Sequence, residues 1–518
     1  MALWTCFLII CQLQALALGD VGFDMFFKTN LAEMSDSPLV YDRPLPSWLR
    51  GSLIRNGVGR FEIGNRHVTT TLDAYAKLSK WTFNNNSVQP TTTFSTKFVQ
   101  SDSFTQSVAA GDIKPYMMLA PVEPPFAPWQ TLQSMRLGAD NMNVNVFNYG
   151  GKGNNSEGFV ITSDYWNVYG IDPHTLGTRK PIKPKTPNAP FYDKMIVLGC
   201  SHSLPEHGTK NYITFLTLAS AVPGLKSRYY IYRATSDEDR EQIAEIEADK
   251  ASYMHSFALT KNYMILVTTT LFFDLEKVYT TFNPSDALQY DPNAPVVFHT
   301  VNLKTGFVES YQTENFFFLH HMNSFENELG ELVIDLVTYQ NGYAMNIMNL
   351  KKLVNATTRS WFQPPLIKRF TLNIPRKTID VSTFDNLTPN LPYTSKFDFP
   401  TINENFRFEK YCYVYGVVYA VNGSDFLDMA LVKKDVCTGK TDKAWYKKGS
   451  YFNEAFFVPR PGGVEEDDGV VLVDILDTVT KTSAMVVFDA KTMTIISTAQ
   501  LPTNNPFGTH GRFFPEIV

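Results

Sequence analysis

Short apolar runs recur along the whole chain, and their composition predicts strands. They are rich in β-branched and aromatic residues, which suit a pleated, half-buried surface. Gly, Pro, Asn and Asp bound them, as expected where strands end in turns. The clearest helical candidate, residues 237–247, is short, so the pattern predicts an all-β protein. The clearest predicted strands cover residues 158–162, 229–232, 264–269, 332–338, 411–420, 469–476 and 484–488.

A turn of the form Asp/Asn-x-x-Thr recurs four times. An Asp or Asn in the first position opens a turn by bonding its own backbone two residues further on. Residues 172–175, 302–305, 435–438 and 489–492 have this form, each close to an apolar run. A recurring hairpin signature in a long all-β chain favours radial repetition, as in a β-propeller. A double sandwich would show the same turns and remains the alternative.

The first residues of the chain predict a signal peptide. Residues 2–18 are uncharged and almost wholly apolar, and residues 17–19 give the small–large–small pattern of a cleavage site. We expect residues 1–19 to be removed and residues 20–518 to form a single large domain. The apolar stretch is shorter than the roughly 20 residues that a membrane-spanning helix needs.

Five N-x-S/T sequons fit a glycoprotein that is secreted or stays in the lumen of the secretory pathway. They lie at Asn85, Asn154, Asn355, Asn386 and Asn422. The net charge of −5 is spread over mixed acidic and basic residues without a long basic run. Nucleic acid is therefore not an expected partner.

Three cysteines, Cys200, Cys412 and Cys437, remain after the predicted cleavage. An odd number forbids full pairing, so either Cys412 and Cys437 bridge neighbouring strands or all three are buried thiols. Because a core of this size needs no covalent support, we expect free thiols. The 39 Phe and 25 Tyr residues fit bulky packing in a β-protein first and an aromatic-lined ligand tunnel second.

Four of the nine histidines stand in apolar or small-residue surroundings. They are His202, His255, His320 and His510. Their spacing lets them fall at the inner ends of different propeller blades and meet on the axis. The chain has no CxxC or HExxH motif, so no zinc signature competes, and imidazole suits iron, copper, zinc and nickel alike. Four neutral ligands leave a divalent charge uncompensated, so carboxylates are expected behind them.

Several motifs, in order along the chain, resemble the carotenoid cleavage oxygenase family, which includes β-carotene oxygenases and the retinal-pigment-epithelium isomerohydrolase. Residues 51–62 read GSLIRNGVGRFE and residues 140–146 read DNMNVNV. Residues 256–260 follow His255 as SFALT, and residues 465–472 read EEDDGVVL. An H-x-x-N frame begins at His320 rather than at the adjacent histidine. The likeness covers almost the whole chain after residue 19.

The resemblance implies an all-β, seven-bladed β-propeller with one iron(II) ion, Fe(2+), per chain on its axis. The ligands would be the same four histidines. Asp164, Asp398 and Glu454 match the acidic residues that the family places behind three of the rings, where each would accept Nδ1–H and aim Nε2 at the metal. The family usually has Glu at all three positions. Aspartate is one methylene shorter, so the bond at Asp164 and Asp398 would be lengthened, bridged by water or rescued by a backbone shift.

Other positions carry weaker expectations. Ser163 occupies the place where many family members carry a hydroxyl near the oxygen site, which makes it a catalytic candidate. Four residues near His320 are candidates for lining a substrate tunnel, with plain core packing as the alternative: Phe316, Phe317, Phe318 and Met322. Residues 72–81 depart from the family pattern. Residues 116–129 are apolar and form either a membrane-touching tunnel mouth or a packed, Pro-rich loop.

The resemblance implies oxidative cleavage of a carotenoid or apocarotenoid double bond by dioxygen, which gives two carbonyl products. A polyene has no polar handle along its length, so an apolar tunnel must set the position of cleavage. Two alternatives remain open. The chain is either a secreted carotenoid- or retinoid-binding protein with a retained but inactive iron site, or an isomerohydrolase of retinyl esters.

Overall fold

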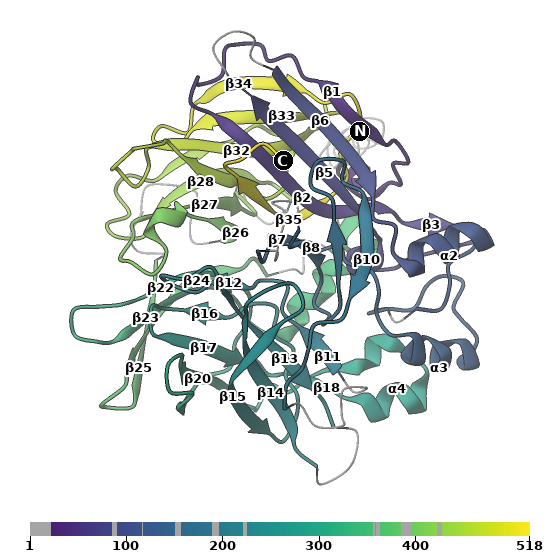
Figure 1. Ribbon diagram of the computed structural model, residues 1–518, viewed down its shortest axis with the longest axis vertical. Helices are drawn as coiled ribbons and strands as arrows, with labels where there is room; N and C mark the ends of the chain where they lie inside the picture. The colour runs from purple at the N-terminus through teal and green to yellow at the C-terminus, as the bar shows by residue number, and fades with distance from the viewer. Residues whose placement is uncertain are drawn as a thin grey trace, which may run out of the picture.

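Seven antiparallel sheets surround one axis in this computed structural model (Figure 1). The structure describes residues 22–84, 91–116, 118–150, 157–188, 196–220, 225–355, 358, 363–384, 396–421 and 427–518. Within these residues each sheet has four or five strands and forms one blade. The fold is therefore the seven-bladed β-propeller that the sequence predicts, and the double sandwich is excluded.

Each blade takes its strands almost in chain order. Blade 1 contains β1 (Met34–Pro38), β2 (Arg50–Arg60), β5 (Tyr75–Asn84), β6 (Thr91–Phe98) and β35 (Gly508–Phe514); blade 2 contains β7 (Asn145–Asn148), β8 (Phe159–Thr162), β9 (Val168–Ile171) and β10 (Thr178–Ile182). Blade 3 contains β11 (Ile196–Gly199), β12 (Leu204–Pro205), β13 (Tyr212–Leu218), β14 (Ser227–Ala234) and β15 (Arg240–Ala248); blade 4 contains β16 (Ala258–Leu259), β17 (Tyr263–Thr268), β20 (Val296–Asn302) and β21 (Val308–Thr313).

The remaining blades follow the same plan. Blade 5 contains β22 (Phe317–Glu326), β23 (Leu332–Tyr339), β24 (Leu366–Asn373) and β25 (Thr378–Thr383); blade 6 contains β26 (Phe397–Thr401), β27 (Tyr413–Val418), β28 (Ala430–Asp435) and β29 (Lys443–Trp445). Blade 7 contains β30 (Ser450–Phe452), β31 (Phe456–Pro459), β32 (Gly469–Asp477), β33 (Thr482–Asp489) and β34 (Ile495–Gln500); two short ribbons pair β3 (Glu62–Ile63) with β4 (Arg66–His67) and β18 (Leu271–Phe273) with β19 (Leu288–Tyr290).

The ring closes where the last strand joins the first blade. β35 pairs antiparallel with β2, with Leu53 opposite Phe513. Figure 1 shows the yellow C-terminal strand lying against the purple N-terminal ones. Closure of this kind leaves few exposed sheet edges, which would otherwise invite pairing with another chain.

All four predicted Asx turns form. In each, the first side chain accepts hydrogen bonds from the two backbone N–H groups two and three residues further on. They connect β9 to β10, β20 to β21, β28 to β29 and β33 to β34. The repeated motif therefore marks the outer hairpin of blades 2, 4, 6 and 7.

The seven predicted strands are confirmed, but the predicted helix at residues 237–247 is wrong. Most of that segment is strand β15, which pairs with β14 along its length. Arg240, Ala244 and Ile246 are buried between exposed residues, which is the alternation of a strand. The charged residues on the outer face have a weak intrinsic preference for helix. Pairing with the buried strand β14 outweighs that preference.

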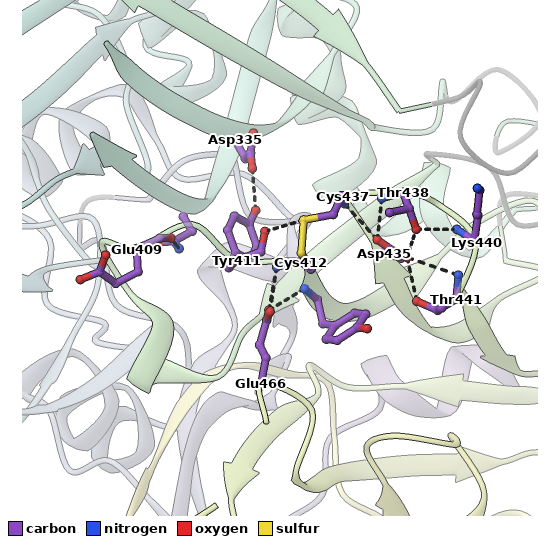
Figure 2. Close-up of a disulfide and its surroundings, with 12 residues drawn as sticks. Asp335, Glu409, Tyr411, Cys412, Asp435, Cys437, Thr438, Lys440, Thr441 and Glu466 are labelled. Carbon is purple, nitrogen blue, oxygen red and sulfur yellow. Dashed lines mark hydrogen bonds between the residues drawn. A yellow bond between two sulfur atoms is a disulfide. The ribbon is translucent and has the colours of Figure 1, made fainter. Parts of the chain in front are cut away.

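A disulfide joins Cys412 and Cys437 in blade 6, so the expectation of free thiols is wrong for this pair (Figure 2). Strand pairing explains the bond, because Tyr413 lies opposite Asp435 and leaves the two cysteine Cα atoms 5.0 Å apart. Glu466 fixes the same corner by accepting hydrogen bonds from the backbone N–H groups of Cys412 and Tyr413. Cys200 is a buried free thiol, as expected.

Few helices accompany the blades. They are η1 (Phe23–Phe27), η2 (Thr71–Asp73), α2 (Asp102–Ala110), α3 (Pro128–Leu137), α4 (Leu275–Thr281), η4 (Pro284–Ala287), η5 (Gly342–Met348), α5 (Leu350–Val354) and η7 (Glu404–Phe406). Figure 1 shows α2, α3 and α4 on one side of the propeller. Within the described parts of the chain, every helix is too short or too polar to cross a membrane.

Aromatic side chains fill the spaces between blades. For example, the ring centroid of Phe298 in blade 4 lies 5.1 Å from that of Phe370 in blade 5 and 6.3 Å from that of Phe316, just before β22. Such contacts account for much of the aromatic excess, as the simpler interpretation of the composition expects. The remaining aromatic residues of interest lie at the axis.

Candidate metal centre

Four histidines from four blades meet on the propeller axis. His202 lies between β11 and β12, His255 stands three residues before β16, His320 is in β22 and His510 is in β35. One ring nitrogen from each lies within 4.8 Å of the others, and the Nε2 atoms of His202 and His255 are 2.9 Å apart. The sequence-predicted ligand set is therefore brought together at one point.

A β-bulge sets the direction of His320. The pairing of β22 with β23 shifts its register between Phe318 and His321, so the strand is locally irregular at this position. Bulges re-aim side chains that a regular strand would point elsewhere. Here His320 turns to the axis, while the ring of His321 bonds Ser324 at 2.7 Å instead.

Three carboxylates lie behind three of the rings. Nδ1 of His255 is 2.8 Å from Asp164, Nδ1 of His320 is 2.5 Å from Asp398, and Nδ1 of His510 is 2.8 Å from Glu454. When Nδ1 carries the proton for such a bond, Nε2 keeps a free lone pair that faces the common point. Both aspartates reach their rings directly, without a lengthened bond.

The acids come from the blades that supply no histidine. The histidines belong to blades 1, 3, 4 and 5, whereas the acids belong to blades 2, 6 and 7. All seven blades therefore contribute to one centre, which links its geometry to closure of the whole ring.

Further hydroxyl groups hold the two aspartates, and sequence reasoning missed them. Ser201 donates to Asp164 at 2.5 Å and Tyr253 donates to the same carboxylate at 2.7 Å. Tyr339 donates to Asp398. Ser201 and Tyr253 stand close to predicted ligands in the chain, so proximity in sequence is a usable signal for them, but no motif marks Tyr339.

Burial and neighbouring groups shift the pKa values of the histidines and of the carboxylates behind them. Burial, strengthened by the neighbouring rings, holds the pKa of His202 well below its usual range, and burial also lowers the pKa of His510. Burial opposes ionisation of Asp164 and Asp398, but the bonds from their histidines outweigh it and lower both pKa values. Neutral imidazole is therefore favoured at His202 and His510, close to ionised carboxylates. At His320 burial alone would lower the pKa, but the charge of Asp398 outweighs burial and the pKa is raised.

The donor set fits a divalent transition metal. Metal–nitrogen bonds of about 2.1 Å place the ligand nitrogens of one ion roughly 3 to 4 Å apart. The observed separations, 2.9 Å for one pair and within 4.8 Å for all four, are close to that range. Imidazole nitrogen suits iron, copper, zinc and nickel. The three carboxylates supply the negative charge that four neutral ligands lack. The centre could therefore hold one such ion on His202, His255, His320 and His510.

An apolar cavity opens onto the histidine cluster. It encloses about 990 Å³ of empty space, part of which is open to solvent, and His255, His320 and His510 line it at one end. Its other walls come from η1, η2, η5, α5 and the inner ends of blades 4 to 7. Its apolar lining includes Phe23, Phe26, Phe27, Leu72, Leu319, Met345, Met348, Leu353, Leu427, Met429 and Phe507.

Phe399 lines this cavity beside the histidine rings, and its backbone is strained. Its φ of 55° lies in the left-handed region, which is costly for an aromatic residue. Its ring centroid is 5.4 Å from that of His320 and 5.9 Å from that of His510. The bulge in β26 between Asp398 and Thr401 produces this conformation, so the same bulge places both a carboxylate and an aromatic wall.

A second cavity of different character also reaches the cluster. It is polar, encloses about 710 Å³ and is lined by His202, His320 and His510 together with charged groups. Glu404 and Arg407 form an ion pair within it, and Arg512 lies on the same wall. The histidine cluster thus faces both an apolar cavity and a polar one.

Comparison with known proteins identifies the family. The sequence profile described as retinal pigment epithelial membrane protein matches residues 29–515. The chain belongs to this family.

Relatives within the family have named activities. The mitochondrial carotenoid-cleaving dioxygenase of Macaca fascicularis is 27% identical, over 91% of this chain and 90% of its own length. The beta,beta-carotene 15,15'-dioxygenase of Gallus gallus is 25% identical, over 91% and 94%. Cobalt-substituted Synechocystis apocarotenoid oxygenase superposes with a TM-score of 0.79 at 20% identity, over 95% of this chain and 98% of that one, which establishes a shared fold.

Most of the aromatic residues expected to line a family tunnel lie elsewhere. Phe316 and Phe318 belong to the packed core between blades 4 and 5, and Met322 lines the polar cavity. Phe317 packs behind two tyrosines of the apolar cavity, with centroids 6.4 Å from Tyr253 and 6.3 Å from Tyr339. The core-packing alternative thus describes the three phenylalanines better, because the local strand geometry brings Leu319 and His320 to the apolar cavity instead.

Ser163 is buried beside Asp164, and its hydroxyl donates to Asn143 at 3.4 Å. It is not among the described residues that line the apolar cavity, so a catalytic role remains a prediction. The altered segment at residues 72–81 contains Asp73, whose buried carboxylate accepts hydrogen bonds from the backbone N–H groups of Leu119 and Ala120. Asp73 therefore anchors the apolar segment 116–129, which is partly packed and partly exposed.

The features that predict export lie mostly outside the described residues. Residues 1–19 do so entirely, as do the sequons at Asn85, Asn154, Asn386 and Asn422. Asn355 is described and exposed at the end of α5. Its glycosylation remains a prediction that the geometry permits.

Proposed function

We propose that the chain is an iron(II)-dependent dioxygenase that cleaves a carotenoid or apocarotenoid double bond into two carbonyl products. The observation that carries the proposal is the four-histidine cluster at one end of an apolar cavity. The family and the names of the relatives support carotenoid oxygenase chemistry in general. Iron, rather than another divalent metal, is part of the proposal.

The chain's own residues would perform the binding and orientation. His202, His255, His320 and His510 would hold the ion, which when bound supplies activation of dioxygen. The carboxylates keep three rings in the ligating tautomer. The apolar walls would hold a polyene by burial alone and exclude water, so the depth to which it slides selects the bond that is cleaved. Both oxygen atoms of dioxygen end in the products, one in each carbonyl.

Metal analysis and product analysis on the same preparation test the proposal. Purified protein is assayed for iron and then given β-carotene, an apocarotenoid and a retinyl ester under ¹⁸O-labelled dioxygen. We expect about one iron per chain and labelled aldehydes or ketones from a polyene. Iron with retained pigment and no carbonyl product would favour the binding protein, and retinol from the ester would favour the isomerohydrolase.

A ligand variant ties turnover to the site. His255→Ala should remove both bound iron and product formation, because it deletes one of four ligands. His299→Ala is the matched control, since His299 bonds only Ser310 and Thr268 among its described side-chain partners and lies away from the cluster. Unchanged activity in His255→Ala would contradict the assignment.

We also propose that the protein passes through the secretory pathway and touches a membrane surface. The predicted signal peptide, the sequons and the disulfide are typical of an oxidising compartment. Trp129 and Leu132 are exposed on α3. The apolar segment 116–129 lies beside this helix, and both line a further apolar cavity that is separate from the two at the histidine cluster. Secretion into culture medium, with a mass decrease after endoglycosidase treatment, tests the route.

A further inference from the structure

The two aspartates of the centre share an arrangement that the longer Glu454 does not have. Each binds a histidine ring through one contact and a tyrosine hydroxyl through another: Tyr253 for Asp164 and Tyr339 for Asp398. Glu454 instead lies beside the buried guanidinium of Arg55. Among the three carboxylates, a tyrosine hydroxyl therefore donates to each of the two aspartates, whose side chains are one methylene shorter than glutamate.

Tyr339 offers the clearer case, because Tyr253 stands only two residues before the ligand His255, whereas Tyr339 is on another strand than any of the four histidines. It ends β23 in blade 5, opposite Phe317, whereas Asp398 projects from β26 in blade 6. Oδ1 of Asp398 faces Nδ1 of His320 at 2.5 Å and accepts the Phe399 N–H at 2.7 Å. Oδ2 accepts the Tyr339 hydroxyl. Every oxygen of this buried carboxylate is thus held.

The phenol remains a donor under ordinary conditions. Tyr339 is buried, and that burial, together with the nearby Asp398 charge, raises its pKa well above the usual range. A buried carboxylate oxygen without a donor bears the full cost of losing its hydration, with no hydrogen bond to compensate. Removing the hydroxyl would therefore favour rotation of the Asp398 carboxylate away from His320, toward another hydrogen-bond donor.

We propose that Tyr339 is a positioning residue for the metal centre. Its hydroxyl holds the short Asp398 side chain where it fixes the tautomer and direction of His320, so that tyrosine and aspartate together replace the single glutamate usual in the family. This inference rests on the proposed function only in taking the four-histidine cluster as a metal centre. Since Tyr339 also lines the apolar cavity, the rival role is that it merely shapes the space for substrate.

Cobalt(II) binding to the full chain, stripped of metal, separates the two roles without any turnover. The affinity and the visible ligand-field spectrum are measured for wild type and Tyr339→Phe. We expect about a tenfold loss of affinity, because outer partners of ligating histidines typically contribute 10- to 100-fold, and a changed spectrum. Tyr411→Phe is the matched control: this buried phenol donates to the buried Asp335 at 2.7 Å near the disulfide (Figure 2), and its loss should leave cobalt binding unchanged.

A rescue variant adds the decisive comparison. Asp398→Glu alone should weaken binding, since the longer side chain runs into the Tyr339 hydroxyl. Asp398→Glu combined with Tyr339→Phe should restore affinity to within about threefold of wild type, because the phenyl ring leaves room for the longer acid. Such non-additivity is expected for residues in contact or in one hydrogen-bond network, and not for distant, independent sites.

The outcomes are distinct. Wild-type affinity and spectrum in Tyr339→Phe, with only the product pattern altered, would show that the residue shapes the cavity and would overturn the inference. Absence of cobalt binding in the wild type would overturn the proposed metal centre and the inference with it. Melting curves of the metal-free variants, which should match that of Tyr411→Phe, distinguish a local effect from unfolding.

Discussion

Buried carboxylates in this protein behave in opposite ways, depending on which group donates to them. Asp164 and Asp398 bond imidazole rings, and despite their burial their pKa values are lowered. Among the described residues, Asp73 accepts hydrogen bonds only from the backbone N–H groups of residues 119 and 120, and burial dominates, raising its pKa to about 7. For these three carboxylates, a readily protonated partner offsets the cost of burial at Asp164 and Asp398, whereas two backbone donors do not offset it at Asp73.

Asp73 makes stability depend on pH. Its pKa is about 7 in the folded protein, whereas the unfolded chain releases the proton near the usual 3.8. The folded state therefore binds more protons between these values, and stability falls as pH rises through that window. Above pH 7, Asp73→Asn should be more stable than wild type by more than about 1 kcal/mol, since a tenfold change in proton affinity corresponds to about 1.4 kcal/mol.

Urea unfolding at pH 4.5 and pH 7.5 measures the effect. The exposed Asp380, changed to Asn, serves as control and should follow wild type at both values. Parallel curves for Asp73→Asn and wild type across the range would contradict the role assigned to Asp73.

The residues that sequence can reveal are those whose chemistry is rare. Histidine is scarce, so four of them in apolar surroundings stand out, and three acids follow from family motifs. Tyr339 cannot be found in this way, because one tyrosine among 25 carries no signal. Its role depends on two strands of different blades approaching each other, which only the folded chain reveals.

Although it has only five residues, η1 forms part of the wall of the apolar cavity. Phe23 and Phe26 are buried, and all three of its aromatic residues line the apolar cavity. The ring of Phe26 packs edge-on against Tyr451 and Phe507, with centroids 6.4 and 6.1 Å apart. The N-terminal segment is thus a wall of the chamber.

Phe26→Ala should enlarge this chamber and change the cleavage position. The lost packing should cost about 3 kcal/mol or more of stability, while a polyene slides further and yields products of different mass. Mass spectrometry of the products and thermal unfolding check the two effects. Phe307→Ala, at a position 64% exposed, should alter neither; an unchanged product pattern in Phe26→Ala would show that η1 does not set the depth.

Helix α3 should govern attachment to lipid. Trp129 is 65% exposed and Leu132 is 42% exposed on this short helix. Changing both to Ser should weaken co-sedimentation with phosphatidylcholine vesicles about tenfold or more, because burying each side chain contributes about 1.5 to 3 kcal/mol. The pair Leu329→Ser and Val464→Ser, exposed in loops elsewhere, is the control. Equal vesicle binding by the two double variants would argue against a role of α3 in lipid attachment.

Elements are predictable where local pattern and tertiary context agree. Alternating β-branched runs and Asx turns predict the strands and the outer hairpins, since both depend on neighbours in sequence. Strand β15 resembles a helix in sequence because its outer face is charged, and the register with β14 cannot be seen locally. The Cys412–Cys437 bond escapes prediction for the same reason, since pairing across β27 and β28 creates it.

At the scale of the whole molecule, the ring and the centre depend on each other. β35 closes blade 1 and also carries His510. Gly511, the next residue, lies so close to β2 that a Cβ atom would come within 2.5 Å of the Ile54 carbonyl oxygen. The number of blades follows only from family resemblance, because no local pattern counts them.

Gly511→Val should open the closure. The added side chain collides with backbone that cannot yield, so we expect a loss of about 3 kcal/mol or more in stability together with lower metal content. Thermal unfolding and elemental analysis measure both. Gly177→Ala, in an exposed turn where only a threonine hydroxyl is near, should be close to neutral. Closure would not depend on this contact if Gly511→Val melted like wild type.

Histidines from blades 1, 3, 4 and 5 converge at one point. A shared cation would therefore crosslink four segments that are far apart in the sequence. Thermal unfolding of the propeller would then require release of the ion. Chelation should lower the melting temperature, and excess metal should raise it with the logarithm of concentration. Thermal tolerance would in this way report the supply of metal in the protein's surroundings.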